Sequence, residues 1–113
     1  MSRTLILLRH GKSDWNTGAD DHERPLKKRG RNASTLVGKW LKTHDQIPDF
    51  VVASSAKRAM QTAELACEVM GIKKKNIYSR KHIYLATPED LLYVLEDCPE
   101  QAQRVMLVGH NPG

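Results

Sequence analysis

A cation and an imidazole stand at the end of an apolar run near the start of the chain. Residues 5–8 are all leucine or isoleucine, and Arg9, His10 and Gly11 follow them directly. Glycine at position 11 lets the backbone turn tightly, or approach a ligand closely, just after a strand. Ligands bind at the carboxyl ends of strands in open α/β sheets, so the pattern predicts an anion site there. The alternative is that Arg9 and His10 are ordinary solvated residues.

Two further apolar runs lead into residues of the same chemical kind. The run 50–53 precedes a segment that contains Arg58, and the run 105–108 precedes His110. If the strands are parallel, their carboxyl ends share one edge, where two arginines and two histidines converge. This set suits phosphoryl transfer, because a neutral imidazole is a nucleophile near neutral pH and guanidinium groups match phosphate oxygens. Such chemistry requires no metal or other cofactor, and the sequence has no carboxylate cluster to hold a metal ion.

The segment around Arg58 has the pattern of a helix start. Ser54 and Ser55 are predicted at the N-cap, and the helix is expected to end at Gly71. A cation in the first turn is mildly disfavoured by the helix dipole, so its presence indicates that an anion binds there. The alternative is a surface arginine tolerated at modest cost. One face of the helix carries Ala59, Ala63, Ala66 and Met70.

The rest of the chain alternates helix and strand patterns. A polar loop is expected over 14–25, a helix over 27–43, a strand within 76–83, and a helix that Thr87 caps, that begins at Pro88 and that Cys98-Pro99 ends. The alternation predicts one α/β domain over 1–113, with three α/β/α layers and a largely parallel sheet. The expected apolar stripes are Leu36, Val37, Trp40 and Leu41 in one helix, with Trp40 in the core, and Leu91, Leu92, Val94 and Leu95 in the other.

The composition favours some classes of binding partner over others. The formal net charge of +5 favours anionic ones, but the few aromatic residues are not interleaved with the basic ones as in a nucleic-acid platform. We therefore expect phosphorylated substrates and no nucleic acid. The N-terminal apolar run is too short for a signal peptide or a membrane span, which predicts a cytoplasmic protein without membrane contact. Cys67 and Cys98 are expected to be small core residues, and His22, His44 and His82 solvated or loop residues.

Three segments, in order, resemble the histidine phosphatase superfamily, which has the phosphoglycerate mutase-like fold. Residues 8–16 match its extended Arg-His-Gly signature, 54–63 its second-arginine segment, and 108–113 its second-histidine segment. Within the superfamily, the short chain, the 23–26 and 29–30 segments and the Gly-His-Asn-Pro-Gly ending are most similar to SixA-type phosphohistidine phosphatases. The resemblance covers essentially the whole chain.

The resemblance implies a metal-independent phosphatase, without a cofactor, that hydrolyses phosphohistidine on signalling phosphorelay proteins. His10 would become phosphorylated, and Arg9, Arg58 and His110 would form the phosphate pocket. An imidazole leaves phosphorus easily, so the reaction needs no dedicated general acid, although Asp14 and Glu89 remain candidate donors. Secondary substrate contacts are expected from Gly11, Ser13 and Asn16.

The sequence departs from the family at its end. The family fold continues past the second histidine with a further helix and strand, whereas this chain ends at Gly113. We expect the last strand to lack a covering helix on one face, which a homodimer would bury. Alternative functions are a phosphatase or mutase for small phosphoesters, a non-catalytic phosphate-binding or regulatory module, and a basic nucleic-acid binder.

Overall fold

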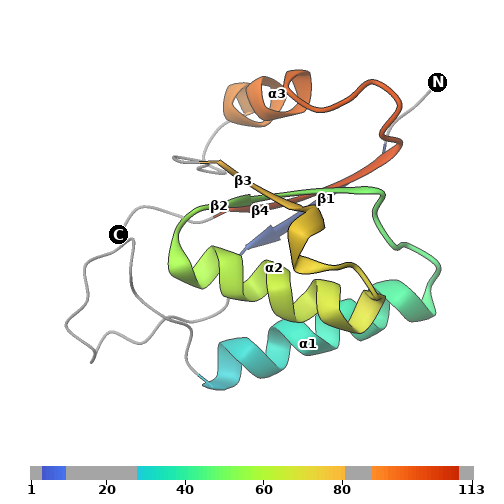
Figure 1. The fold of residues 1–113 in the computed structure, drawn as a ribbon, viewed down its shortest axis with the longest axis vertical. Coiled ribbons are helices and arrows are strands. Elements are labelled where there is room, and N and C mark those ends of the chain that lie inside the picture. The colour runs from blue at the N-terminus through green and yellow to red at the C-terminus, as the bar shows by residue number, and fades with distance from the viewer. Residues whose placement is uncertain (1–3, 10–27, 81–87, 110–113) are drawn as a thin grey trace.

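The computed structural model describes residues 4–9, 28–80 and 88–109, which form four strands, three α-helices and a 3₁₀ turn (Figure 1). Expectations that fall on other residues, including the loop over 14–25 and the positions of His22 and His82, lie outside this part of the chain. The elements are β1 (Thr4–Arg9), α1 (Lys28–Thr43), β2 (Phe50–Ser54), α2 (Lys57–Met70), η2 (Lys74–Asn76), β3 (Ile77–Arg80), α3 (Pro88–Glu96) and β4 (Arg104–Gly109).

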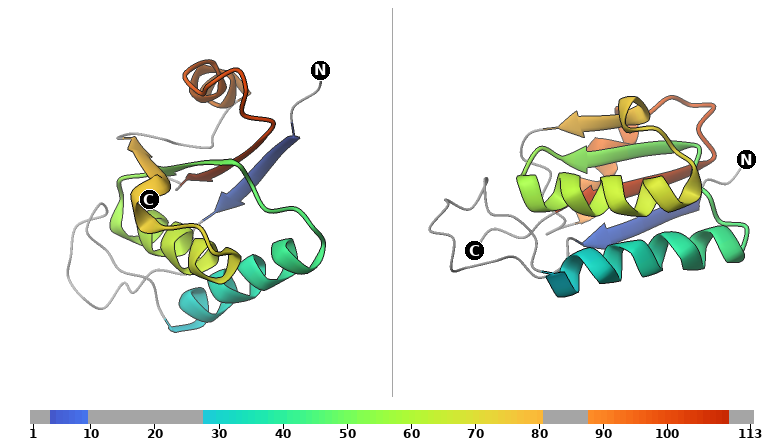
Figure 2. Two further views of the ribbon diagram at one scale, coloured as in Figure 1. Left: turned by 45° about the vertical axis from the view of Figure 1, so that its right-hand side comes forward. Right: turned by 60° about the horizontal axis from the view of Figure 1, so that its bottom comes forward.

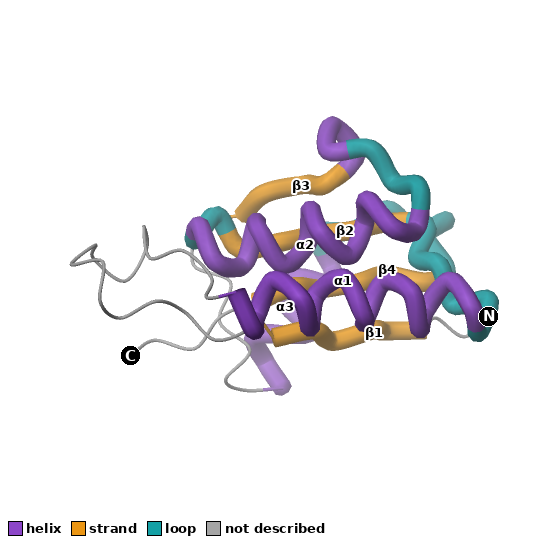
Figure 3. Tube along the Cα trace, turned by 90° about the horizontal axis from the view of Figure 1, so that it is seen from below, coloured by secondary structure: helices purple, strands orange, loops and turns teal. Residues whose placement is uncertain are grey.

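The strands form one parallel sheet in the order β1-β4-β2-β3. Helices α1 and α2 lie side by side on one face and α3 covers the other (Figures 1 and 3). The connections from β1 to β2 and from β2 to β3 move one way across the sheet, whereas that from β3 to β4 moves back. Right-handed crossovers therefore place α3 on the opposite face. The predicted three-layer α/β fold with a parallel sheet is confirmed.

Strand β4 is the centre of the core. The side chains of Val105, Met106, Leu107 and Val108 are fully buried, because neighbouring strands flank β4 and helices cover both faces. Met106 and Val108 pack towards α1 and α2, and Val105 and Leu107 pack on the other side with Cys98. The expected uncovered face on the last strand is therefore wrong, since α3 and the segment after it pack on the face opposite α1 and α2 (Figure 1). The homodimer stays a prediction.

Helices α1 and α2 approach closely through small residues. A Cβ atom added to Gly38 would lie 2.4 Å from the Ala66 carbonyl oxygen, so only glycine fits there. The buried face of α1 is Gly30, Ser34, Gly38 and Leu41. The prediction that Trp40 lies in the core is wrong: its side chain is 57% exposed and that of Leu36 is 63% exposed. Because Gly38 faces α2, Leu36 and Trp40, which lie two positions before and after it, point away from the core.

Helix α2 begins and ends largely as predicted. Its N-cap is Ala56, not a serine; Ser54 instead uses its Oγ to accept a hydrogen bond of 3.2 Å from the Ala56 N–H. Gly71 ends the helix with a left-handed φ of 79°, a conformation that costs glycine little. The predicted alanine face is confirmed, because Ala59, Ala63, Ala66 and Met70 are all buried.

The smaller expectations had mixed outcomes. Strand β3 falls within 76–83, and α3 begins at Pro88 but ends at Glu96, before Cys98. Val94 and Leu95 of α3 pack on the core, whereas Leu92 is 59% exposed. Both cysteines are free and buried, and His44 is exposed, as predicted. Within the described residues no helix is long and apolar enough to cross a membrane.

The carboxylate of Asp49 fixes the start of β2 against the start of β4. Its two oxygens accept hydrogen bonds from the backbone N–H groups of Gln103 (3.0 Å) and Arg104 (3.1 Å). The Asp49 N–H in turn donates to the Arg104 carbonyl oxygen at 2.9 Å. This reciprocal arrangement sets the register in which Val51 pairs with Met106 and Ala53 with Val108.

Replacing Asp49 by alanine should lower the free energy of unfolding by about 1 to 2 kcal/mol, because two backbone N–H groups lose a charged acceptor. Urea denaturation measures this loss. Asp97→Ala is the matched control: Asp97 makes only an exposed ion pair with Arg80 (3.2 Å), which contributes about 0.5 kcal/mol or less. Equal losses in the two variants would contradict a register-setting role for Asp49.

The buried thiol of Cys67 should make stability fall in alkali. Burial raises its pKa from 9.0 to about 11, with a smaller contribution from the charge of Glu64. Between these values the unfolded chain holds fewer protons than the folded one, so stability decreases as pH rises. We expect a loss of about 1 kcal/mol between pH 8 and pH 10 from this group. Urea titrations should show this part of the pH dependence vanish in Cys67→Ala.

Candidate functional site

The carboxyl ends of three strands meet at one edge of the sheet. Arg9, the last residue of β1, pairs with Gly109, the last residue of β4, and Ala53 of β2 pairs with Val108. The first turn of α2 follows β2 at this edge, which is the end of the sheet to which the arrows point in Figure 2. The predicted convergence of strand ends is confirmed for the described backbone.

Arg58 lies buried at this edge. Its side chain is 1% exposed and is the largest fully buried side chain among the described residues. Three alanines near Arg58 in sequence are also completely buried: Ala53, Ala56 and Ala59. Their small volumes let α2 lie close to the sheet. The surface-arginine alternative is therefore wrong. A guanidinium stays charged and is costly to bury, so a position of this kind is typical of a functional cation.

Short hydrogen bonds hold the first turn of α2 in place. The Ser55 N–H donates to the Arg80 carbonyl oxygen at 3.2 Å, and the Met60 N–H to the Ala56 carbonyl oxygen at 3.0 Å. The buried Thr62 hydroxyl donates to the Arg58 carbonyl oxygen at 2.8 Å. A helix N-terminus supplies N–H donors and a positive dipole end. Together with the buried guanidinium, it can bind an oxyanion such as phosphate.

The structure places only some of the predicted site residues. Arg58 is placed in full, and Arg9 is placed by its backbone at the end of β1. Glu89 is exposed near the start of α3. In sequence, His10 and His110 are the residues directly after Arg9 and Gly109. The predicted site residues that lie outside the described part of the chain are His10, Gly11, Ser13, Asp14, Asn16 and His110.

Two polar residues at this edge have roles that the sequence did not reveal. Ser54 and Thr62 are buried, at 0% and 1% exposure, and both bond to the backbone of the turn that carries Arg58. For Ser54 the signal was a serine at the end of an apolar run, where its hydroxyl can close a turn. The sequence pattern predicted Ser54 at the helix N-cap instead, whereas the N-cap is Ala56.

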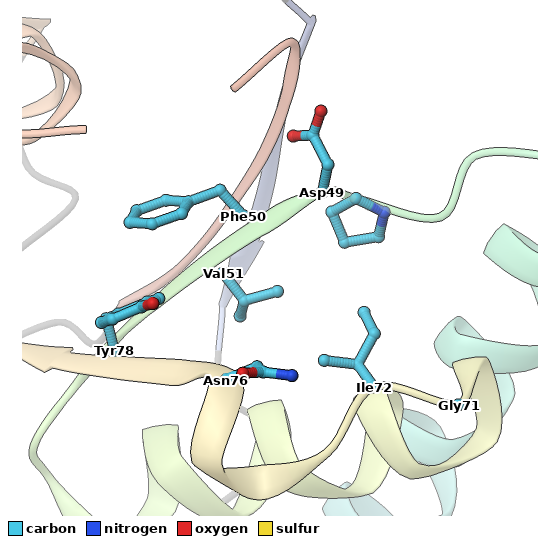
Figure 4. A pocket seen from close by; sticks show the side chains of 8 residues that line it. Asp49, Phe50, Val51, Gly71, Ile72, Asn76 and Tyr78 are labelled. Carbon is cyan, nitrogen blue, oxygen red and sulfur yellow. The ribbon is translucent and has the colours of Figure 1, made fainter. Parts of the chain in front are cut away.

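A pocket of about 300 Å³ lies elsewhere, at the amino ends of β2 and β3 (Figure 4). It is lined by Pro48, Asp49, Phe50, Val51, Gly71, Ile72, Asn76 and Tyr78. The Asp49 carboxylate is already engaged by backbone N–H groups, and the other polar side chains that line this pocket are those of Asn76 and Tyr78. Over the residues that the structure describes, no three His, Cys, Asp or Glu side chains are grouped as metal ligands.

Comparisons with known sequences point to one family. The profile of the histidine phosphatase superfamily (branch 1) matches residues 5–79. An uncharacterised protein of Mycobacterium tuberculosis is 32% identical over 105 residues, which cover 93% of this chain and 63% of that protein. A 2,3-bisphosphoglycerate-dependent phosphoglycerate mutase of Mycobacterium leprae is 43% identical over 70 residues, 58% of this chain and 28% of the mutase. The chain thus spans less than two thirds of these relatives.

Solved structures show the same fold. A protein from Agrobacterium tumefaciens assigned as the phosphohistidine phosphatase SixA has a TM-score of 0.83 and 29% identity, covering 99% of this chain and 72% of that one. A protein with the same assignment from Nakamurella multipartitia has a TM-score of 0.79 and 34% identity, covering 97% and 60%. These similarities confirm the phosphoglycerate mutase-like fold.

Arg58→Lys should weaken the binding of inorganic phosphate by about tenfold or more, because lysine lacks the planar fork that holds two oxygens at once. Isothermal titration calorimetry measures the affinity. Arg104→Lys is the matched control: Arg104 is a partly buried arginine at the opposite edge of the sheet, and its replacement should leave phosphate affinity unchanged. An unchanged affinity in Arg58→Lys would exclude Arg58 from the anion site.

Proposed function

Because the chain belongs to the histidine phosphatase superfamily, we propose that it is a metal-independent phosphatase that hydrolyses phosphohistidine on proteins. The observation that carries the proposal is the burial of Arg58 at the carboxyl edge, beside the paired ends of β1 and β4. The similarity to two proteins assigned as SixA, at 29% and 34% identity, supports the choice of substrate. The two free, buried cysteines are in keeping with a reducing, cytoplasmic location.

In the proposed reaction, a neutral His10 ring nitrogen attacks the phosphorus of the substrate in line with the P–N bond. That bond breaks, and the substrate imidazole, which already carries a proton on its other ring nitrogen, leaves as a neutral imidazole while His10 becomes phosphorylated. Water then attacks the phosphorus of phospho-His10, which releases inorganic phosphate and restores His10. Arg9, Arg58 and His110 stabilise the charge on the phosphoryl oxygens during both steps. Gly11, Ser13 and Asn16 supply secondary contacts, and no step uses a metal ion or another cofactor.

Leaving-group chemistry favours phosphohistidine over phosphoesters. An alkoxide leaves phosphorus poorly unless a general acid protonates it, whereas a protonated imidazole leaves readily. Glu89 is the one candidate acid that the structure describes, and it is exposed on α3. Phosphohistidine is therefore a substrate that the site could turn over without a dedicated acid.

A second candidate function is a mutase or phosphatase for small phosphoesters. The 43% identity to the Mycobacterium leprae phosphoglycerate mutase over 70 residues favours it. The two candidates differ in which substrate is turned over with the higher kcat/KM. A comparison of phosphohistidine with 3-phosphoglycerate and 2,3-bisphosphoglycerate decides between them.

His10→Ala should lower kcat for phosphate release from free phosphohistidine by about a thousandfold or more, because the covalent route is lost. Acid-quenched ³²P labelling should give a phosphoenzyme in the native chain only, and EDTA should change neither result. His44→Ala is the matched control, since His44 is exposed and directly follows the C-terminal end of α1. Turnover that persists in His10→Ala would refute the mechanism. Phosphate binding without turnover by the native chain would indicate a non-catalytic module.

A further inference from the structure

Helix α1 carries a surface that neither the core nor the candidate site uses. Five of its sixteen residues are lysine or arginine and none is acidic. The helix therefore carries a formal charge of +5, which is as large as the net charge of the whole chain. On the same helix Leu36 and Trp40 expose 63% and 57% of their surface. Exposed Trp and Leu side chains beside cations are typical of an interaction surface rather than of a solvated helix face.

Leu36 and Trp40 lie on the side of α1 that faces away from α2. Gly38 marks the α2 contact, and residues two positions before and after it lie about 160° round the helix. We define the α1 outer face as Lys28, Arg29, Leu36, Lys39 and Trp40, all of which are exposed. Arg31 is not part of it, because it lies towards α2 in a groove shared with Glu64 and Glu68.

Trp40 is held in position although it is exposed. Its ring stacks on that of His44, with centroids 4.1 Å apart and an interplanar angle of 20°. The His44 Nδ1–H donates a hydrogen bond to the Trp40 carbonyl oxygen at 2.8 Å, which fixes the stacking ring. A side chain ordered before binding loses less conformational entropy on association. Trp40 therefore has the properties of a binding anchor.

The α1 outer face begins on the side of the molecule where the strands end and runs towards the amino edge of the sheet. The short connection from α1 to β2 puts the end of the helix at the amino edge of the sheet, so its start, with Lys28 and Arg29, lies at the carboxyl edge (Figure 2). Trp40 lies about 18 Å further along the helix axis. A small phosphoester at the site cannot reach it, whereas a protein can contact both.

We propose that the α1 outer face docks the phosphoprotein substrate, through an acidic surface with an apolar ridge next to its phosphorylated residue. This proposal rests on the proposed function and adds the partner's surface chemistry. Charge complementarity carries it, since the α1 outer face has three cations, Lys28, Arg29 and Lys39, and α1 has no acidic residue. Such a face repels basic surfaces and attracts acidic ones. Burial of Leu36 and Trp40 against the partner then slows dissociation of the complex.

The test compares a protein substrate with a small one. The protein substrate is a histidine-phosphotransfer domain with an acidic surface, phosphorylated with phosphoramidate, and the small one is free phosphohistidine. Arg29→Glu with Trp40→Ala should raise KM for the domain by about tenfold or more. It should leave kcat, and all turnover of free phosphohistidine, unchanged. Added salt should raise KM in the native chain more than in the variant.

A matched double variant controls for charge and apolar loss. Lys42→Glu with Tyr93→Ala makes the same changes at exposed positions outside the α1 outer face and should leave KM for the domain unchanged. Circular dichroism checks that both variants fold. Equal effects of the two variants, or equal effects on both substrates, would overturn the docking proposal. So would loss of binding to phosphatidylglycerol vesicles with an unchanged KM for the domain, which would assign the surface to a membrane.

Failure of the proposed function is separable from failure of docking. If the native chain hydrolyses neither substrate, the proposed function is wrong. Docking is then judged by titrating the unphosphorylated domain, whose Kd should rise about tenfold in Arg29→Glu with Trp40→Ala. An unchanged Kd would overturn docking as well.

Discussion

The register between β2 and β4 is the constraint on which the candidate site depends. At the amino edge, the Asp49 carboxylate accepts two N–H groups from the start of β4. Because parallel strands have a fixed rise per residue, a register set at one edge is also set at the other, where Ala53 lies opposite Val108. A displacement by one residue would turn every β2 side chain to the other face and move the turn that carries Arg58. An interaction remote from the site thus positions its buried cation.

Small residues form the closest contacts of the helices in this fold. The alanines around Arg58 let the first turn of α2 lie close to the sheet, and Gly38 lies against Ala66. Leu36 and Trp40 lie two positions before and after Gly38, about 160° round the helix, so they point outward. The contact of α1 with α2 through Gly38 therefore leaves an exposed apolar surface on the outer side of α1. If that surface docks a substrate, the helix pair links protein recognition to the phosphate site.

The division of the chemistry between edges also follows from topology. The carboxyl ends of parallel strands all lie at one edge of the sheet, and Arg9, Gly109 and the start of α2 lie there. The opposite edge holds the Asp49 contacts and the pocket of about 300 Å³. Stability and function are thereby separated, because hydrogen bonds that fix the sheet do not compete with those that would bind a phosphoryl group.

Local pattern determined much of this protein. Continuous apolar runs specified β1, β2 and β4, and Gly71 and Pro88 marked helix ends. The order of strand and helix patterns specified a parallel α/β sheet, because these signals depend only on neighbouring residues. The position of Arg58 in the first turn of α2 was likewise predictable. Its burial was not, nor were the Asp49 contacts with residues 103 and 104 or the outward side of Trp40. Each of these depends on which distant segment packs against the residue, and only the tertiary structure decides that.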